Sequence, residues 1–199
     1  HEDPRPFVTM ARWLAERSFA APAILALDLD RGLVLLEDFG DDRLREAADA
    51  DAVATVPLYE AAVDLLVALR AHPASELRAY DRAELQREAG LLTEWYCPAV
   101  GAAADVAGYR AAWDAVLDRA EPLIPVAVLR DYHAENLMLV GPERRMGLLD
   151  FQDALAGHPA YDLVSLLQDA RRDVDPALED RMLARYRAAT GEGDSFMDA

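Results

Sequence analysis

Lysine is absent from this chain of 199 residues, so all 20 of its basic residues are arginine, against 37 acidic ones. The formal net charge of −17 excludes a protein that binds nonspecifically along the phosphates of nucleic acid. The same charge excludes adhesion to an anionic membrane surface. We therefore expect neither nucleic acid nor membrane as a partner.

Cysteine is almost as scarce, because Cys97 stands alone and no internal disulfide can form. Chains without disulfides are typical of reducing compartments. The sequence also has no apolar run close to the ~20 residues of a membrane-spanning helix, and no basic, apolar leader at its start. These features predict a cytoplasmic protein. Its 53% hydrophobic and 29% charged residues are typical of a folded globular domain.

Hydrophobic periodicity indicates a helix and a hairpin in the first forty residues. Helical spacing covers residues 4–18. Two apolar runs follow at 24–29 and 33–36, joined by Asp30-Arg31-Gly32, and they predict a β-hairpin. A polar connector begins at residue 37.

Beyond the connector the pattern is helical as far as about residue 120. One apolar stripe, at 58–69, is expected to begin its helix at Pro57. A second helix is capped by Asp81 and a third covers 109–120. The second helix is expected to bury Leu85, Ala89, Leu92 and Tyr96. The tryptophans, also expected in the core, are Trp13, Trp95 and Trp113.

Short strands return after the helical region. The candidates lie at 125–129, 137–140 and 146–149, and two helices follow at 161–171 and 176–189. A strand hairpin followed by a mostly helical region with a small β insertion predicts an α+β architecture.

The loop between the first two of these strands is denser in polar residues than a core requires. It contains Asp131 and Asn136, and Asp150 stands at the end of the next hairpin. Because a hairpin returns the chain to its starting point, we expect Asn136 and Asp150 to lie side by side. Amide and carboxylate oxygens are ligands that Mg²⁺ accepts. Asp131 could take the proton of a hydroxyl nucleophile, a division of tasks typical of phosphoryl transfer.

The spacing Asp131-x-x-x-x-Asn136, followed by a hairpin and Asp150, resembles the catalytic loop and metal-binding aspartate of kinases. With the segment 157–163, Gly-His-Pro-Ala-Tyr-Asp-Leu, it resembles the aminoglycoside phosphotransferase family over residues 4–190. The resemblance implies a protein-kinase-like α+β fold. It makes Asp131 the catalytic base, and Asn136 and Asp150 the ligands of Mg²⁺.

The same resemblance implies an ATP-dependent enzyme. It makes Glu37, Asp38 and Phe39 the hinge whose backbone meets adenine, and it gives Asp162 a structural role beside the catalytic loop. It also divides the chain into residues 1–40, a remnant of an N-terminal lobe, and residues 41–199, a mostly helical C-terminal lobe.

Within the family, the segments around Asp131 and Asp150 are similar to bacterial kinases that phosphorylate N-acetylmuramate and N-acetylglucosamine at the anomeric hydroxyl. This likeness implies a small-molecule sugar as substrate, with His133, Gln152 and Asp153 as candidate contacts to its hydroxyls. His133 could equally be a local hydrogen-bonding partner. An aminoglycoside kinase and a catalytically idle binding module are the alternatives.

Three departures from the family pattern bear on activity. Leu129 stands where the family usually has a histidine, and the chain has neither a glycine-rich phosphate loop nor a lysine for the α- and β-phosphates. We therefore expect that most of the N-terminal lobe is missing and that the 199 residues alone transfer phosphate poorly. Residues encoded upstream of His1 would separate a kinase from an idle module.

Overall fold

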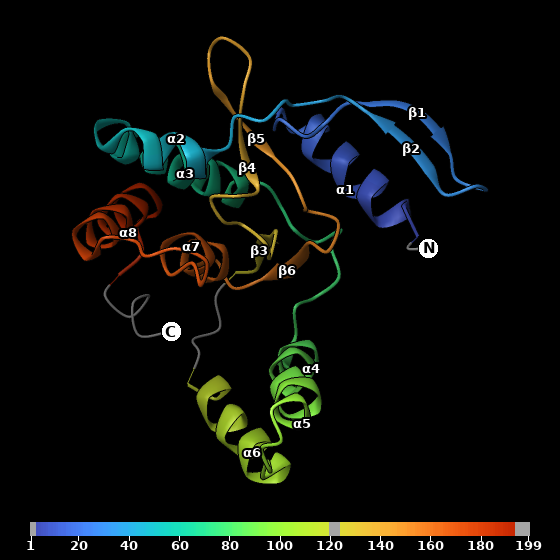
Figure 1. Ribbon diagram of the computed structural model, residues 1–199, viewed down its shortest axis with the longest axis vertical. Coiled ribbons are helices and arrows are strands. Elements are labelled where there is room, and N and C mark those ends of the chain that lie inside the picture. Colours follow the sequence, from blue (N-terminus) through green and yellow to red (C-terminus); the bar gives the residue numbers. More distant parts are fainter. Residues whose placement is uncertain (1–2, 120–123, 194–199) are drawn as a thin grey trace.

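A computed structural model describes residues 3–119 and 124–193 (Figure 1). The predicted α+β architecture is confirmed, since the described residues form helices and three two-stranded antiparallel sheets. The helices are α1 (Arg5–Glu16), α2 (Leu44–Ala50), α3 (Ala52–Arg70), α4 (Arg82–Leu91), the π-helix η1 (Leu92–Tyr96), α5 (Cys97–Ala99), α6 (Val106–Leu117), α7 (Ala160–Leu167) and α8 (Pro176–Thr190). The strands are β1 (Ile24–Asp28), β2 (Leu33–Leu36), β3 (Val126–Val128), β4 (Leu137–Val140), β5 (Arg145–Leu148) and β6 (Leu155–Gly157).

The first forty residues fold as the periodicity predicts, into α1 and the β1–β2 hairpin. Helix α1 buries its apolar face, including Met10, Trp13 and Leu14, in the main core. Gly32 closes the hairpin with a φ of 69°, a left-handed conformation that glycine adopts without a steric penalty.

Helix α3 begins earlier than predicted. Its first residue is Ala52, because Asp51 accepts a hydrogen bond from the Val53 amide at 2.8 Å and caps the helix. Pro57 lies inside the helix instead of opening it, so the prediction of a start at this proline was wrong. The missing N–H of Pro57 removes one helical hydrogen bond within the first two turns.

By length and composition, α3 meets the criterion for a membrane-spanning helix, contrary to the expectation from sequence, although core helices of soluble proteins meet it too. The helix carries Glu60 and Asp64. These carboxylates pair with Arg181 and Arg185 of α8 at 2.7 and 2.6 Å. Leu66 and other apolar residues of α3 are buried in the main core.

Helices α4 to α6 form a unit that extends away from the remaining helices (Figure 1). The predicted cap is confirmed, with Asp81 accepting from the Glu84 amide at 3.0 Å. The predicted burial is wrong for Leu92 and Tyr96, which are 44% and 60% exposed, and Trp95 is 69% exposed. Leu85 and Ala89 are half-buried, and Leu85 packs against the smaller apolar cluster around Tyr80. Trp113 is also exposed, so of the three tryptophans only Trp13 lies in the core. Among the described residues of this unit, Leu91, Leu92 and Val116 are also exposed.

The strands predicted after residue 120 are present, and they lie around the polar loop. Strand β3 pairs with β6, a strand of three residues that the periodicity did not indicate. Strand β4 pairs with β5 with Leu137 opposite Leu148, so the two ends of this hairpin meet. The segment before α4 joins β6 through the Tyr80 amide, which donates to the Ala156 carbonyl at 2.8 Å.

Candidate active site

The loop from Leu129 to Asn136 follows β3 and precedes β4, and it is called the catalytic loop after the role that the sequence predicts for it. Its start is fixed by Asp162 in the first turn of α7. The two carboxylate oxygens of Asp162 accept from the Leu129 and Arg130 amides at 2.7 and 2.9 Å. Burial raises the pKa of Asp162 to about 7, while the two backbone donors act in the opposite direction. Asp162 therefore sets the point at which the loop leaves β3.

Asn136 links the catalytic loop to the far end of the β4–β5 hairpin. Its side-chain nitrogen Nδ2 donates to the Asp131 carbonyl at 3.0 Å and lies 3.5 Å from Asp150 Oδ2. The backbone carbonyl of Asn136 accepts from the Leu149 amide at 3.0 Å. The structure thus places Asn136 and Asp150 side by side, as the spacing predicts, and brings both to the loop that carries Asp131.

Asp150 presents its carboxylate to solvent from a constrained turn. Its φ is 57°, and Oδ1 accepts a hydrogen bond from Gln152 Nε2 at 2.6 Å. The next residue, Phe151, is fully buried and stacks on Phe7 of α1, with the ring centroids 5.1 Å apart. This buried ring holds the turn, so that Asp150 faces outward beside Asn136.

The chemistry of this pair fits Mg²⁺. No cluster of three or more His, Cys, Asp or Glu side chains suited to a metal occurs in the part of the chain that the structure describes. Mg²⁺ is usually held by one or two protein oxygens together with substrate phosphates and water. An amide oxygen of Asn136 and the carboxylate of Asp150 match that demand.

His133 lies inside the loop and not on its surface. Its side chain is buried, and Nε2 lies 3.2 Å from Asn136 Nδ2. Burial lowers the pKa of His133, with a smaller effect from Arg171, so the neutral ring is favoured. Of the two roles that the sequence leaves open, this placement favours local orientation of Asn136.

Gln152 and Asp153 follow Asp150 around the same turn. Gln152 is half-buried and bonded to Asp150, whereas the Asp153 side chain is exposed. The backbone carbonyl of Asp153 accepts from Arg130 Nη1 at 3.3 Å. The Gln152 side chain therefore lies beside the Asn136–Asp150 pair, and the backbone of Asp153 lies against Arg130.

The segment predicted to be the hinge connects β2 to the helical region. Glu37 makes two hydrogen bonds with Ala23. Its amide donates to the Ala23 carbonyl at 2.8 Å, and its carboxylate accepts from the Ala23 amide at 3.1 Å. Asp38 accepts from the Gly40 amide at 2.8 Å. The Phe39 ring packs against Gly147 of β5, where an added Cβ would lie 2.8 Å from the ring. The segment 37–39 thus packs against the same β4–β5 hairpin that brings Asn136 and Asp150 together.

Two charged anchors of the catalytic loop gave no signal in the sequence. The Arg45 amide of α2 donates to the Ala134 carbonyl at 3.1 Å, and its guanidinium pairs with Glu135. On the other side of the loop, Arg130 pairs with Glu88 of α4. Each pair joins residues far apart in a chain rich in both charges, so no local pattern marks them.

The chain matches the phosphotransferase enzyme family over residues 1–197. Among curated proteins it is similar to an N-acetylmuramate/N-acetylglucosamine kinase of Caulobacter vibrioides, with 41% identity over 94% of this chain and 56% of that protein. A protein of the same name from Pseudomonas aeruginosa is 38% identical over 85% of this chain and 50% of its own length. The chain spans about half the length of the curated relatives it matches.

Solved structures give the same fold at low identity. An aminoglycoside phosphotransferase in complex with gentamicin has a TM-score of 0.69 and 16% identity, over 93% of this chain and 66% of that chain. A choline kinase from Streptococcus pneumoniae has a TM-score of 0.68 and 16% identity, over 96% and 62%. The predicted protein-kinase-like fold is confirmed, and the chain belongs to the phosphotransferase enzyme family.

Proposed function

We propose that this chain carries the catalytic loop of a cytoplasmic, ATP- and Mg²⁺-dependent kinase that phosphorylates the anomeric hydroxyl of N-acetylmuramate and N-acetylglucosamine. The observation that supports phosphoryl transfer is that the Asn136 side chain contacts both the Asp150 carboxylate and the backbone carbonyl of Asp131. The names of relatives 35–41% identical to the chain support the substrate.

Asp131 is the proposed catalytic base. It orients the acceptor hydroxyl and takes its proton as the hydroxyl oxygen bonds to the γ-phosphorus and the bond to the bridging oxygen of ADP breaks. Asn136 and Asp150 would hold Mg²⁺, which when bound would neutralise charge on the phosphates. The backbone of Glu37, Asp38 and Phe39 would meet adenine.

An anomeric hydroxyl suits a carboxylate base, because it is more acidic than an ordinary alcohol. Gln152 offers both donors and an acceptor, and Asp153 offers acceptors, so the two could bind sugar hydroxyls beside the reacting centre. His133 would not contact the sugar and would instead orient the side chain of Asn136. The choice of an N-acetylated sugar over an aminoglycoside rests on the names of the relatives.

The proposal assigns residues 1–40 to an N-terminal lobe and residues 41–199 to a mostly helical C-terminal lobe. The hinge segment at residues 37–39 would join them. A phosphate-covering loop and a phosphate-binding lysine are not among these 199 residues. In the proposed enzyme, other residues of the full-length gene product would supply them.

A screen of ATP consumption with the full-length gene product tests the function. It compares N-acetylmuramate and N-acetylglucosamine with a panel of aminoglycosides, and Asp131→Asn provides the background. We expect turnover with the two amino sugars. Turnover with aminoglycosides alone would replace the proposed acceptor, and no turnover with any acceptor would favour an idle binding module.

A further inference from the structure

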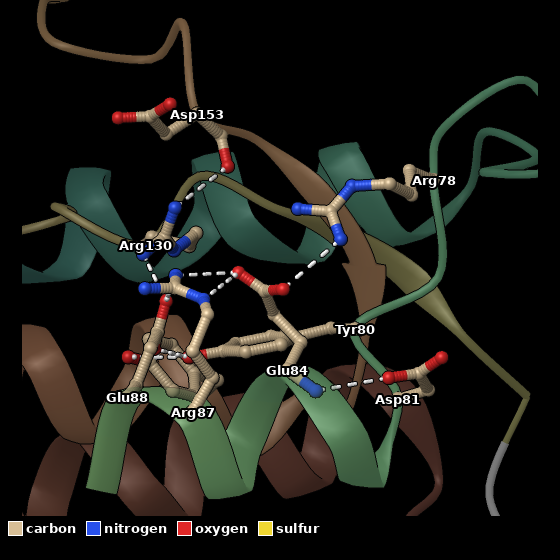
Figure 2. Close-up of polar contacts among 9 residues, drawn as sticks. Arg78, Tyr80, Asp81, Glu84, Arg87, Glu88, Arg130 and Asp153 are labelled. Atoms are coloured by element: carbon tan, nitrogen blue, oxygen red, sulfur yellow. Dashed lines mark hydrogen bonds and ion pairs between the residues drawn. The ribbon is translucent and has the colours of Figure 1, made fainter. Parts of the chain in front are cut away.

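The side chain of Arg130, the residue before Asp131, joins three separate parts of the chain (Figure 2). Its guanidinium pairs with Glu88 of α4 and donates from Nη1 to the Asp153 carbonyl at 3.3 Å. It also lies over the Tyr80 ring, 5.7 Å from the ring centroid. Arg130 thus bridges the catalytic loop, the turn after Asp150 and the helix α4.

Glu88 is itself held in place on α4. The Tyr80 hydroxyl donates to its carboxylate and lies 3.0 Å from the Tyr161 hydroxyl. Arg87 also reaches Glu88, at 3.3 Å, but Arg87 bonds mainly to Glu84 at 2.6 Å (Figure 2). The side chains of Arg130 and Glu88 are only 20% and 18% exposed, so water and salt screen this pair less than a surface pair.

The backbone conformation of Arg130 depends on the contacts that hold this residue in place. Its φ is 75°, a left-handed conformation that is uncommon for a residue with a Cβ. Such conformations persist where the surroundings enforce them. Here Asp162 holds the amide of Arg130, and Glu88 and Asp153 hold its guanidinium. The turn at Arg130 sets the direction in which the chain runs from β3 to Asp131.

We infer that Arg130 is a positioning residue of the phosphoryl-transfer site and that Glu88 acts through it, so that α4 fixes the loops carrying Asp131 and Asp150 relative to each other. This inference rests on the proposed function. Arg130 need touch neither substrate nor nucleotide. Its effect belongs to the chemical step, because small misplacements of reacting groups reduce the rate of that step steeply.

Steady-state kinetics of the full-length protein test the role. Arg130→Met should lower kcat about 10- to 100-fold and leave KM for ATP and for the sugar within about threefold. Arg130→Lys should rescue little, because an ammonium cannot serve Glu88 and the Asp153 carbonyl in the geometry of a guanidinium fork. The matched control is Arg82→Met, which removes an α4–α6 ion pair remote from the loop and should leave kcat unchanged.

A double-mutant cycle tests whether Glu88 acts through Arg130 or whether the two residues affect kcat independently. Glu88→Ala should lower kcat, and the double variant Glu88→Ala with Arg130→Met should be no slower than Arg130→Met alone. Multiplicative losses, or a wild-type kcat in Arg130→Met, would overturn the inference. Losses confined to KM would also overturn it.

Amide hydrogen exchange gives a readout that needs no substrate. In Arg130→Met, exchange should accelerate in peptides covering 129–136 and 150–155 and stay unchanged in α3 and α8. Unchanged exchange in both loops would overturn the inference even if the wild-type protein phosphorylates no amino sugar. In that case the proposed function would fail separately, on the wild-type assay.

Discussion

At the scale of single residues, the proposed site separates proton transfer from metal binding. Asp131 lies at one end of the catalytic loop, while Asn136 and Asp150 meet across the hairpin, joined by the Asn136 amide. Substitutions at the two positions should therefore affect different kinetic steps.

Asp131→Asn keeps the shape of the side chain but removes its ability to accept a proton. We expect turnover to fall about 10²- to 10⁴-fold, with thermal stability and nucleotide affinity nearly unchanged. The measurement is kcat of the full-length protein alongside ATP titration and thermal unfolding. A loss of less than about tenfold would contradict the role of the base.

Asp150→Ala should act before the chemical step, because a metal ligand contributes to binding of the nucleotide complex. We expect weaker ATP affinity in the presence of Mg²⁺ and little change when EDTA removes the metal. Calorimetric titration in both conditions checks this. Equal affinities for wild type and variant with Mg²⁺ present would exclude Asp150 as a ligand.

Asp162 predicts a pH dependence of stability. Its pKa is raised to about 7, against about 3.9 for an unfolded aspartate, so the folded protein binds more protons between these values. Its contribution to the free energy of unfolding is therefore largest below pH 4 and is lost as the pH rises to 7. An asparagine amide in its place does not titrate, so Asp162→Asn removes this dependence.

The corresponding test compares wild type with Asp162→Asn by urea unfolding at several pH values. The stability of the wild type relative to the variant should decline by a few kcal/mol from pH 4 to pH 7, since one pKa unit is worth about 1.4 kcal/mol. A difference that stays flat or grows with pH would show that Asp162 is ionised throughout this range.

At the scale of elements, the β4–β5 hairpin connects the segment proposed as the hinge to the pair proposed to bind Mg²⁺. Gly147 leaves the space that Phe39 and Val140 occupy, since an added Cβ would lie 2.8 and 2.6 Å from their side chains. Gly147→Ala should displace the Phe39 ring, lower stability by about 1–3 kcal/mol and weaken nucleotide binding.

Gly90→Ala is the matched control for that substitution. Gly90 lies in α4, and no described atom beyond its chain neighbours and its own helix backbone lies within 4 Å of its added Cβ. Alanine should stabilise this helix by about 0.5–1 kcal/mol and leave nucleotide affinity unchanged. Unaltered ATP affinity in Gly147→Ala would contradict the prediction that packing of Phe39 on this hairpin supports nucleotide binding.

Local patterns predicted most elements and the central geometry of the site. Alternation and helical spacing were sufficient for α1, the β1–β2 hairpin and the Asp81 cap, and a hairpin of known length necessarily brings Asn136 to Asp150. Such features depend on neighbours in the sequence. Their physical causes are therefore visible without a structure.

Features set by distant contacts were not predictable. Periodicity marks the apolar face of a helix but not what covers it, so Trp95 and Trp113 were wrongly placed in a core. The pairs Arg45–Glu135 and Glu88–Arg130 join residues 90 and 42 positions apart, and no spacing rule connects them. Tertiary structure alone reveals these anchors of the loop.

At the scale of the whole molecule, the family and the substrate rest on different grounds. The match over residues 1–197 and the fold neighbours show a phosphotransferase family member. The amino-sugar acceptor is proposed from relatives of which this chain spans about half. A direct test must therefore identify the product and not merely the consumption of ATP.

Phosphorus NMR of the reaction product tests this claim most directly. The full-length gene product is incubated with ATP, Mg²⁺ and N-acetylmuramate or N-acetylglucosamine, with Asp131→Asn as the inactive control. We predict a sugar 1-phosphate, recognised by coupling of phosphorus to the anomeric proton. A phosphate on the 6-hydroxyl, or a product only from aminoglycosides, would contradict phosphorylation of the anomeric hydroxyl.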